Sequence, residues 1–409
     1  MISPKFKRFK SLKNSDDDRN RPMTTANAVS KQWADVWPSF PVIDFDEGDS
    51  DDLAKYRRFL TFLENCLKRC KKQRLLDKLK LRIMYSVAGD YEETIDKWVS
   101  FAIQRCVKDL DLRFIEAETE VSFYLIPQAV FSSNFLTSLN LEKVTVIYSC
   151  RIDGPISLPL LKTMSLKEVE FDDEDDDHAL PCLISGCPSI QHLSLDQCDL
   201  GCSAASLEIS SLSLKSLEIR NCHSLDFTLK TINLESFDFV SECTCAYHDL
   251  LTLWDCYNLK HLYIFSKGLK QLHMFGCEKG MDNSIFTPNL NYFMFSGVVE
   301  VKVHFVEAPS SLLHALIRIT NYWWTFEYYS FLRDCLESVN CSRKVEIDIR
   351  DAEGVIIPEH CRMEWSPPLP SIKHLQLTFA VPLGDRDYWL NPSLTWIAPS
   401  AKILPYRYD

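Results

Sequence analysis

One spacing of apolar residues recurs along most of the chain: an apolar residue, a second three positions later and a third after two more, written LxxLxL. The last two apolar residues of each copy alternate with another residue, so both side chains point to the same side of a short strand. The copies are Val107-Leu110-Leu112, Leu136-Leu139-Leu141, Leu161-Met164-Leu166, Ile190-Leu193-Leu195, Leu214-Leu217-Ile219, Leu234-Phe237-Phe239, Leu259-Leu262-Ile264, Leu269-Leu272-Met274, Leu290-Phe293-Phe295 and Ile372-Leu375-Leu377.

Most copies follow one another at about 20 to 29 residues, which is typical of leucine-rich repeats. A single repeat cannot bury its apolar face, so neighbouring repeats must stack. The sequence therefore predicts an α/β fold, a leucine-rich-repeat solenoid with short parallel strands on one concave sheet. The step of ten residues between Leu262 and Leu272 breaks the period, and the pattern leaves open which of the two lies in a strand. The expected strands are 110–112, 139–141, 164–166, 193–195, 217–219, 237–239 and 293–295.

The flanking segments follow other patterns. Apolar residues near helical spacing predict helices within 53–76 and 326–339. Alternation of apolar and polar residues predicts a half-buried strand from Val299 to Phe305 and another from Val345 to Ile349. The chain accordingly divides into a disordered tail at 1–23, a separate motif at 24–47, a helical linker or N-terminal cap at 48–105, repeats at 106–298, and a mixed α/β C-terminal region with a late repeat at 299–409.

The side chains that point away from the core change character along the repeats. In the middle repeats they are mainly polar, as at His192, Glu218 and Arg220. In the later repeats they become aromatic, and exposed clusters of this kind mark interaction surfaces. The alternative is a shift of one residue in register, which would turn the same side chains into the core. The candidate target-binding residues are His261, Tyr263, Phe265, His273, Phe275, Tyr292 and Met294.

Composition excludes several classes of partner. A net charge of −12 is unsuited to a nucleic acid, because phosphate binding needs a basic face. No run of 18 apolar residues is present, so we expect no membrane-spanning helix. The basic start, MISPKFKRFKSLK, lacks the apolar stretch of a secretory signal. We therefore expect a protein of the cytoplasm, the nucleus or both.

The sequence also lacks the motifs of common enzymes. The phosphate-binding loop, the dinucleotide fingerprint, the zinc-protease motif and the nucleophile elbow are all absent, so we predict no catalysis and no cofactor. The acidic run DDEDDD at 172–177, beside His178, has no ordered ligand spacing and is interpreted as a solvated loop rather than a metal site. Cys198, Cys222 and Cys277 each follow an L-x-L pair by three residues. Without a C-x2-C pair they are predicted to be buried thiols rather than zinc ligands.

Several segments resemble one plant family. TTANAVSKQWADVWPSFPVIDFD at 24–46 is similar to the second half of a plant F-box, and the matching positions are Val29, Ser30, Lys31, Trp33, Trp37, Pro41, Asp44 and Phe45. DKWVSFAIQRCVKDLDLRF at 96–114 and CLISGCPSIQHLSLDQC at 182–198 resemble segments of plant F-box/leucine-rich-repeat proteins. LPSIKHLQLTF and SLTWIAPSAKIL resemble the C-terminal region of the same family, so the resemblance extends over roughly residues 24–409.

This resemblance implies a substrate-recognition subunit of a Skp–cullin–F-box ubiquitin ligase. The F-box, here a helical remnant with Val29, Trp33 and Trp37 as adaptor-binding residues, would bind a Skp-type adaptor joined to a cullin. The repeats would bind an unidentified target protein. The place of the first F-box helix holds KNSDDDRNRPMT, which has no apolar stripe, so we predict weak adaptor binding. The alternative is a leucine-rich-repeat interaction protein that has lost its coupling to the ligase.

Overall fold

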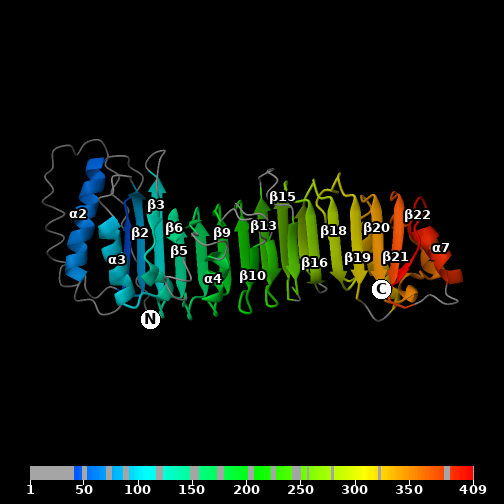
Figure 1. The fold of residues 1–409 in the computed structure, drawn as a ribbon, viewed down its shortest axis with the longest axis horizontal. Helices are drawn as coiled ribbons and strands as arrows, with labels where there is room; N and C mark the ends of the chain where they lie inside the picture. Colours follow the sequence, from blue (N-terminus) through cyan, green and yellow to red (C-terminus); the bar gives the residue numbers. More distant parts are fainter. Residues whose placement is uncertain are drawn as a thin grey trace, which may run out of the picture. The chain divides into compact units, whose positions relative to one another are not determined.

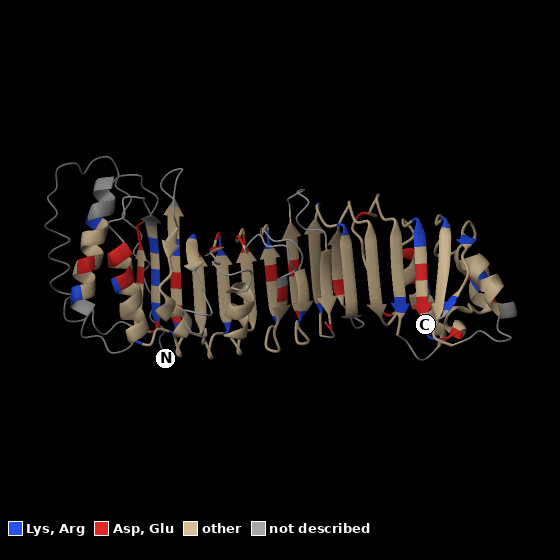
Figure 2. Ribbon diagram, viewed as in Figure 1, with Lys and Arg blue, Asp and Glu red and all other residues tan. Residues whose placement is uncertain are grey.

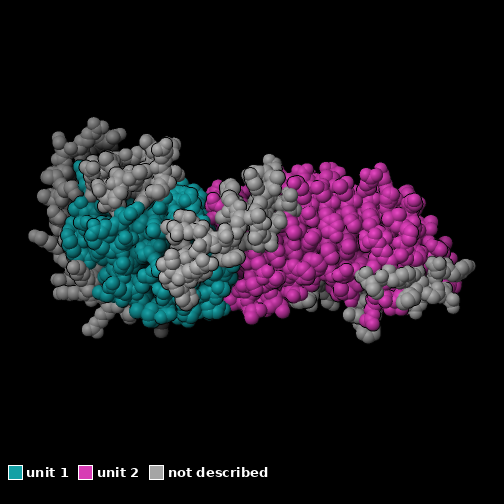
Figure 3. All heavy atoms as spheres, in the orientation of Figure 1, with its two compact units in different colours: residues 1–190 teal, residues 191–409 magenta. Residues whose placement is uncertain are grey.

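Two units make up the protein in the computed structural model, residues 1–190 and residues 191–409 (Figure 3). Within each unit the chain winds in coils whose parallel strands lie side by side (Figure 1). The predicted α/β repeat fold is therefore confirmed. The structure describes residues 41–47, 53–70, 76–85, 92–116, 123–147, 156–172, 179–200, 207–222, 227–241, 250–255, 258–277, 281–320, 324–381 and 387–408.

The main sheet of the first unit is parallel throughout. Its strands, in spatial order, are β1 (Val42–Asp46), β2 (Lys78–Tyr85), β3 (Asp109–Glu116), β5 (Ser138–Glu142) and β7 (Thr163–Lys167). A small parallel sheet contains β4 (Tyr124–Leu125), β6 (Val144–Ile147) and β8 (Glu170–Asp172). The connections carry α2 (Leu53–Cys70), α3 (Glu92–Gln104), η2 (Gln128–Ser132) and α4 (Ala179–Ser185). Trp98 of α3 packs edge to face on Phe45 of β1 at a centroid distance of 5.3 Å, so α3 covers the inner side of the main sheet.

The L-x-L pairs form the inner face of this sheet, as their spacing predicts. Leu110, Leu112 and Leu141 have no exposed surface, and the residues between them are partly exposed or point outward. Burying one such aliphatic side chain stabilises the fold by about 1.5–3 kcal/mol. The strands predicted at 110–112, 139–141 and 164–166 are confirmed.

The second unit has two parallel sheets, which the chain enters alternately. The first sheet contains β9 (His192–Asp196), β11 (Ser216–Arg220), β13 (Ser236–Ser241), β15 (His261–Ser266) and β17 (Asp282–Phe286). Phe227 of β12 and Phe239 of β13 meet at a centroid distance of 5.7 Å, so the inner faces of the two sheets share one core. The second sheet contains β10 (Leu207–Ser210), β12 (Phe227–Lys230), β14 (Leu250–Trp254), β16 (Gln271–Cys277), β18 (Tyr292–Gly297), β19 (His314–Ile319), β20 (Lys344–Ile349) and β21 (His374–Phe379), with the short β22 (Lys402–Ile403) and β23 (Arg407–Tyr408) paired to β21.

The two-sheet arrangement corrects the prediction of a single sheet. Residues 293–295 form part of β18 in the second sheet, whereas 193–195, 217–219 and 237–239 lie in the first. The LxxLxL copies at Leu262 and Leu272 are both strands, β15 in the first sheet and β16 in the second. Their short separation arises because a single corner joins them, whereas two successive strands of the same sheet are separated by a whole coil.

The coils change form after β18, while the second sheet continues. α5 (Phe326–Glu337) joins β19 to β20, η3 (Ala352–Val355) and α6 (Glu359–Glu364) join β20 to β21, and α7 (Asp387–Ile397) follows β21. α5 begins after Thr325, whose side-chain oxygen accepts a hydrogen bond from the Tyr328 backbone N–H at 3.2 Å. The helix and the strand predicted at 326–339 and 345–349 are confirmed. Because β19, β20 and β21 extend the repeat sheet, the repeats run beyond residue 298 into the region that was expected to be a mixed cap.

The N-terminal expectations need a correction. The helix predicted within 53–76 exists as α2, but β2 lies within the segment 48–105 that was expected to be a helical linker or cap, and residues 42–46 at the end of the F-box-like motif form β1. The reason is pairing with the repeats: Ile43 and Phe45 are buried on the inner face beside Leu79 of β2, in the register of the sheet. In β2 the buried Leu79, Leu81 and Ile83 alternate with basic residues, so the local pattern of this segment is that of a strand and not of a helix.

A second correction concerns the alternating segment from Val299 to Phe305. Val299, Val301 and Val303 are buried, as the alternation predicts, but residues 299 and 300 lie in a turn, in which the Val301 N–H donates to the Val298 carbonyl at 3.3 Å. Only one bridge forms, between Ile285 of β17 and Phe305, and the segment is not a sheet strand. Alternating burial therefore does not by itself establish a strand.

Left-handed residues mark the corners where strands end. Lys143, Glu168, Gln197 and Asn221 follow β5, β7, β9 and β11, with φ values of 56°, 50°, 54° and 49°. The backbone N–H of Gln197 donates to the Arg220 carbonyl at 2.8 Å, so the corner itself continues the hydrogen bonding between neighbouring coils. Such a conformation costs a residue other than glycine about 1–2 kcal/mol, which the packed coils offset.

The predicted cysteines lie just past these corners. Cys198 and Cys222 are buried, as predicted, and each thiol donates to the carbonyl two residues before it, of Asp196 and Arg220. A hydrogen bond with Cys198, together with burial, raises the pKa of Cys222 well above its ordinary value. The Cys222 thiol therefore stays protonated, and both buried side chains pack as small apolar groups. The side chain of Cys277 lies outside the described residues.

Candidate functional site

The predicted target-binding residues lie on two faces of the second unit instead of one. His261, Tyr263 and Phe265 alternate with the buried residues of β15 and point outward from the first sheet. The other four point outward from the second sheet, and they are His273, Phe275, Tyr292 and Met294. Because the inner faces of the two sheets meet in the core, the two groups face in different directions. All are at least partly exposed, so the alternative register, which would bury them, is excluded.

The outward side of the second sheet carries a continuous group of rings. Trp254 of β14 stacks on Phe275 at a centroid distance of 3.9 Å and an interplanar angle of 7°. His273 meets Phe275 and Tyr292 edge to face at 6.2 and 5.4 Å, and Tyr292 meets His314 of β19 at 5.2 Å. We call these five residues the aromatic face. Each such pair contributes about 0.5–1.5 kcal/mol beyond burial, so the rings hold one another in place before any partner arrives.

The aromatic face carries no net charge near neutral pH. Burial lowers the pKa of His273, and burial followed by the nearby Lys344 lowers that of His314. Both imidazoles are therefore neutral at pH 7. Burial raises the pKa of Tyr292, so its hydroxyl stays protonated. A neutral surface of stacked rings favours apolar and aromatic side chains of a partner.

A buried carboxylate lies beside the aromatic face on β20. Glu346 is only 7% exposed and lies in register with Met294 and Leu316 of the neighbouring strands. Its carboxylate contacts Lys344 at 3.0 Å, His314 at 3.5 Å and Arg407 at 3.6 Å. Burial acts to raise the pKa of Glu346, but the hydrogen bond and charge of Lys344, followed by the charge of Arg407, outweigh burial and lower it. Glu346 is thus a fixed negative charge that contacts residues of the neighbouring strands. Through it, His314 lies close to Lys344 and Arg407.

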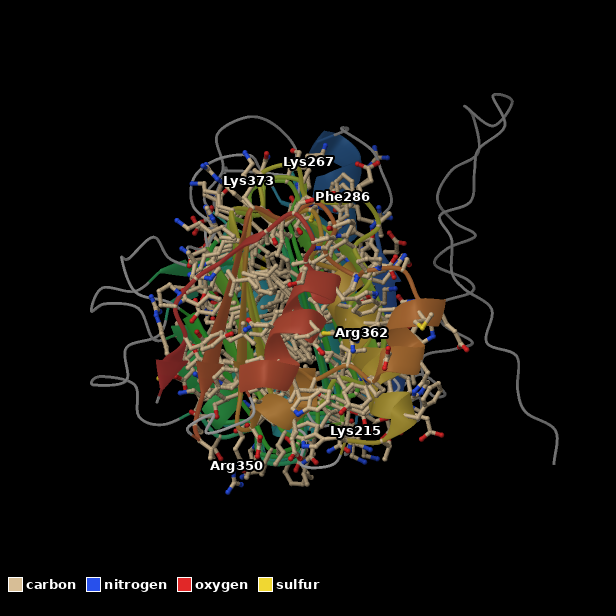
Figure 4. The ribbon with its side chains drawn as sticks, turned by 90° about the vertical axis from the view of Figure 1, so that its right-hand side faces the viewer. Lys215, Lys267, Phe286, Arg350, Arg362 and Lys373 are labelled. Carbon is tan, nitrogen blue, oxygen red and sulfur yellow. The ribbon has the colours of Figure 1, made fainter. Side chains whose placement is uncertain are left out.

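The outward side of the first sheet has a different chemistry. Tyr263 is 42% exposed, and Phe265 stacks on Phe286 of β17 at a centroid distance of 4.9 Å. The ammonium of Lys267 lies 5.9 Å from the centre of the Phe265 ring. Figure 4 places Lys267 and Phe286 on the same side of the unit. The carboxylates of Glu218 and Asp238 lie on adjacent strands in register, next to Tyr263.

The outward side of the main sheet in the first unit is a ladder of paired charges. Strands β2 and β3 carry basic and acidic residues at successive outward positions, seen as blue and red bands in Figure 2. Lys78 pairs with Asp109 at 2.6 Å, and Lys167 pairs with Glu142 at 2.8 Å. Asp111, which is 5% exposed, accepts hydrogen bonds from Arg113 at 2.8 Å and from Asn140 at 2.9 Å.

Some of the predicted positions cannot be placed. The adaptor-binding candidates Val29, Trp33 and Trp37 lie outside the described residues, as do His178 and most of the acidic run at 172–177. Within the described part of the chain, no group of three or more His, Cys, Asp or Glu side chains is arranged to hold a metal ion. No helix among the described residues is long and apolar enough to cross a membrane.

Three residues of the second sheet's outward side were missed by the sequence analysis, namely Trp254, His314 and Glu346. Trp254 and Glu346 belong to strands without a complete LxxLxL copy, and His314 belongs to one whose copy, Leu312-Ala315-Ile317, has the small residue Ala in the middle. The available signal was a shorter one: Leu251 and Leu253 of β14, like Ala315 and Ile317 of β19, alternate with outward residues and are fully buried. A search for alternating pairs alone would have found these strands.

Comparison with known proteins assigns the repeats to a plant group. Residues 95–282 match the model described as the leucine-rich repeats of the FBD-associated F-box protein At5g56370. Two similar proteins from Arabidopsis thaliana are a putative FBD-associated F-box protein and an F-box/FBD/LRR-repeat protein. The first is 29% identical over 241 residues, 55% of this chain and 47% of the relative. The second is 29% identical over 217 residues, 51% of this chain and 45% of the relative. The chain thus spans about half the length of the curated relatives it matches.

Proposed function

From the premise that this chain is a plant F-box/leucine-rich-repeat protein, we propose that it is the substrate-recognition subunit of a Skp–cullin–F-box ubiquitin ligase. The repeats bind a target protein, and the ligase partners carry out ubiquitin transfer. The receptor itself performs no bond chemistry and acts in the cytoplasm, the nucleus or both. The observation that supports the proposal is the aromatic face, a partly exposed surface of rings in mutual contact on a chain whose relatives are named for their F-box and repeats.

The aromatic face has the properties of an interface centre. Rings and histidines in mutual contact present a large apolar area with little side-chain freedom left to lose on binding, and such residues often dominate binding energy. Trp254 is 39% exposed, so its stack with Phe275 offers a ring face to a partner. The paired charges around Glu346 supply the polar border that protein interfaces typically show.

Affinity purification of the tagged chain from plant extracts after chemical cross-linking, which retains weakly bound partners, tests this proposal. A Skp-type adaptor, a cullin and one or more further proteins should co-purify. Phe275→Ala combined with Tyr292→Ala should remove the further proteins but leave the adaptor and cullin. The matched control, Leu212→Ala combined with Met363→Ala, removes two apolar side chains that are 80% and 82% exposed elsewhere and should change nothing. Absence of both adaptor and cullin from every preparation would contradict the proposal.

We further propose that Val29, Trp33 and Trp37 provide a weak adaptor contact. One or two helical turns bury far less than the roughly 1,200 Å² of a stable interface. Calorimetry with a purified Skp-type adaptor should give an affinity much weaker than about 1 μM, and Trp33→Ala should abolish it. Adding a first F-box helix that contains Leu-Pro should restore tight binding. Tight binding by the unmodified chain would show that the segment KNSDDDRNRPMT does not weaken the contact.

The second candidate function is an interaction protein that has lost its coupling to the ligase. The absence of an apolar stripe in KNSDDDRNRPMT favours it. Under this alternative the purified complexes contain the target but neither adaptor nor cullin. The same purification therefore distinguishes the two functions.

A further inference from the structure

The outward side of the first sheet in the second unit is acidic as well as aromatic. Among the outward positions of these five described strands, Arg220 is the one arginine or lysine, whereas four positions are carboxylates. The register places the outward residues in three rows that cross the strands. The first row is His192, Ser216, Ser236, His261 and Asp282; the second is Ser194, Glu218, Asp238, Tyr263 and Ser284; the third is Asp196, Arg220, Val240, Phe265 and Phe286.

In the second, central row, the negative charge of two carboxylates is only partly balanced by nearby positive charge. Glu218 and Asp238 are direct register partners on β11 and β13. Arg220 approaches them at 3.5 and 3.8 Å, and it is shared between both. Burial, followed by the neighbouring Glu218, raises the pKa of Asp238, although Arg220 and His261 act in the opposite direction. The raised pKa means that the pair would gain from one more positive charge.

Rings adjoin these carboxylates along the same face. Tyr263 is the register partner of Asp238 and is 42% exposed, so it flanks the carboxylate with an open ring. In the third row, Phe265 and Phe286 stack, and the chain's own Lys267 lies over the Phe265 ring at 5.9 Å. Lys267 thus makes a cation–ring contact in the third row. The second row offers a ring and two carboxylates, where a cation from a partner could make the same kind of contact.

We propose that this face binds an extended segment of a partner protein that is rich in lysine and arginine. One cationic side chain lies between Glu218 and Asp238 against the Tyr263 ring, and the next lies toward Asp196 or Asp282. Nucleic acid is disfavoured by the sign of the charge.

The length of the segment follows from strand spacing. Five strands at about 4.8 Å apart span roughly 20 Å, which about six extended residues cover. The inference is independent of the aromatic face, because the two surfaces lie on different sheets.

Fluorescence anisotropy with the full chain tests the inference. The probe is a fluorescein-labelled peptide of alternating lysine and serine, about eight residues long, which spans the strands with one residue to spare at each end. The intact chain should bind it, with affinity that falls as salt rises, and should not bind the matching glutamate–serine peptide. Glu218→Gln combined with Asp238→Asn should weaken binding on the order of tenfold, as expected for two lost ion pairs.

Matched variants separate a local site from general acidity. Glu208→Gln combined with Glu337→Gln removes the same charge from other parts of the unit and should leave binding unchanged. Tyr263→Ala should weaken binding a few-fold, and Tyr263→Phe should retain it, because the ring rather than the hydroxyl contacts the cation. Equal losses in both charge variants, or no binding by the intact chain, would overturn the inference. Phe275→Ala with Tyr292→Ala should leave peptide binding intact, so failure here and failure of target binding are distinguishable.

Discussion

The outward sides of the main sheet in the first unit and of the second sheet in the second unit differ, although their strands are built in the same way. Both bury an L-x-L face, and both place one carboxylate in a central outward position with little exposure, Asp111 at 5% and Glu346 at 7%. Around Asp111 the outward charges are paired across the strands, as in Lys78–Asp109 and Lys80–Asp111. Around Glu346 the outward positions are charged, and on the strands toward β14 they are the rings of the aromatic face.

This difference distinguishes a surface whose charges are already paired with one another from a surface whose rings remain open to a partner. At the outward positions of the first unit's described main-sheet strands, each lysine or arginine pairs with an acid of the same sheet, so a partner would have to break existing pairs before it could form new ones. In the second unit the rings contact one another without exhausting their exposed faces. The backbone repeat therefore fixes where side chains point, and the residues between the L-x-L leucines decide whether a sheet holds itself together or binds another protein.

The largest expected effect tests the part that the two regions share. Leu112→Ala in the first unit and Phe293→Ala in the second each remove a side chain with no exposed surface. We expect losses of about 2–5 kcal/mol for the first and about 3–5 kcal/mol for the second, because both leave cavities in close-packed cores. Urea denaturation monitored by circular dichroism measures both. A loss below 1 kcal/mol at either position would show that the two inner faces are not equivalent.

The buried carboxylate of the first unit should matter less than a core leucine and more than its neighbours. Asp111→Ala leaves Arg113 and Asn140 without their acceptor. Hydrogen bonds to a charged group contribute about 1.5–3 kcal/mol, so we expect a loss of about 2 kcal/mol in urea denaturation. Asp109→Ala, at a more exposed pair with Lys78, is the control and should lose less than about 1 kcal/mol.

Glu346, the buried carboxylate of the second unit, should make the free energy of unfolding depend on pH. Its folded-state pKa is lowered, so its contribution to stability is present above about pH 4.3, the value in the unfolded chain, and is lost as the pH falls through the folded pKa. The difference in unfolding free energy between the wild type and Glu346→Gln should therefore shrink from pH 7 to pH 3. Ile317→Val, a core change without a titrating group, should give the same difference at both pH values. If the difference for Glu346→Gln instead grew on acidification, the folded-state pKa of Glu346 would have to be raised and not lowered.

The smallest expected effect concerns one partly exposed ion pair on the main sheet of the first unit. The Lys167–Glu142 pair lies at 2.8 Å, with side chains that are 41% and 23% exposed. A double-mutant cycle with both residues changed to Ala should give a coupling of about 0.2–1 kcal/mol that decreases in high salt. A coupling that is large and insensitive to salt would mean that the ladder of charges is worth more than its exposure suggests.

The sequence predicted the strands well because period-two alternation depends only on local geometry. Leu110 with Leu112 and Phe237 with Phe239 are inward pairs in the structure, as their spacing requires. Alternation does not specify which of two sheets a strand joins. That choice depends on where the corners fall, and these involve residues such as Gln197 and Asn221 whose left-handed conformation has no strong sequence signal.

The same limit explains the division of the candidate site. Tyr263 and Phe275 are close in sequence and both point outward, as predicted, but they belong to β15 and β16 in different sheets. Trp254 and His314 entered the aromatic face only through strand pairing, which brings β14 and β19 to either side of β16 and β18. Pairing between distant segments is a property of the folded coils, so a local pattern could not predict which rings meet.

The stacking of strands also decides how the second unit responds to force. Hydrogen bonds between neighbouring strands run along the stack, so tension applied between β9 and β17 acts on these ladders in series, and each ladder bears the whole force. Each coil contacts mainly its neighbours, and one ladder can open while the rest stay closed. The unit should yield under tension in small successive steps, as a spring of separable turns, and recover by rewinding from the coils that remain.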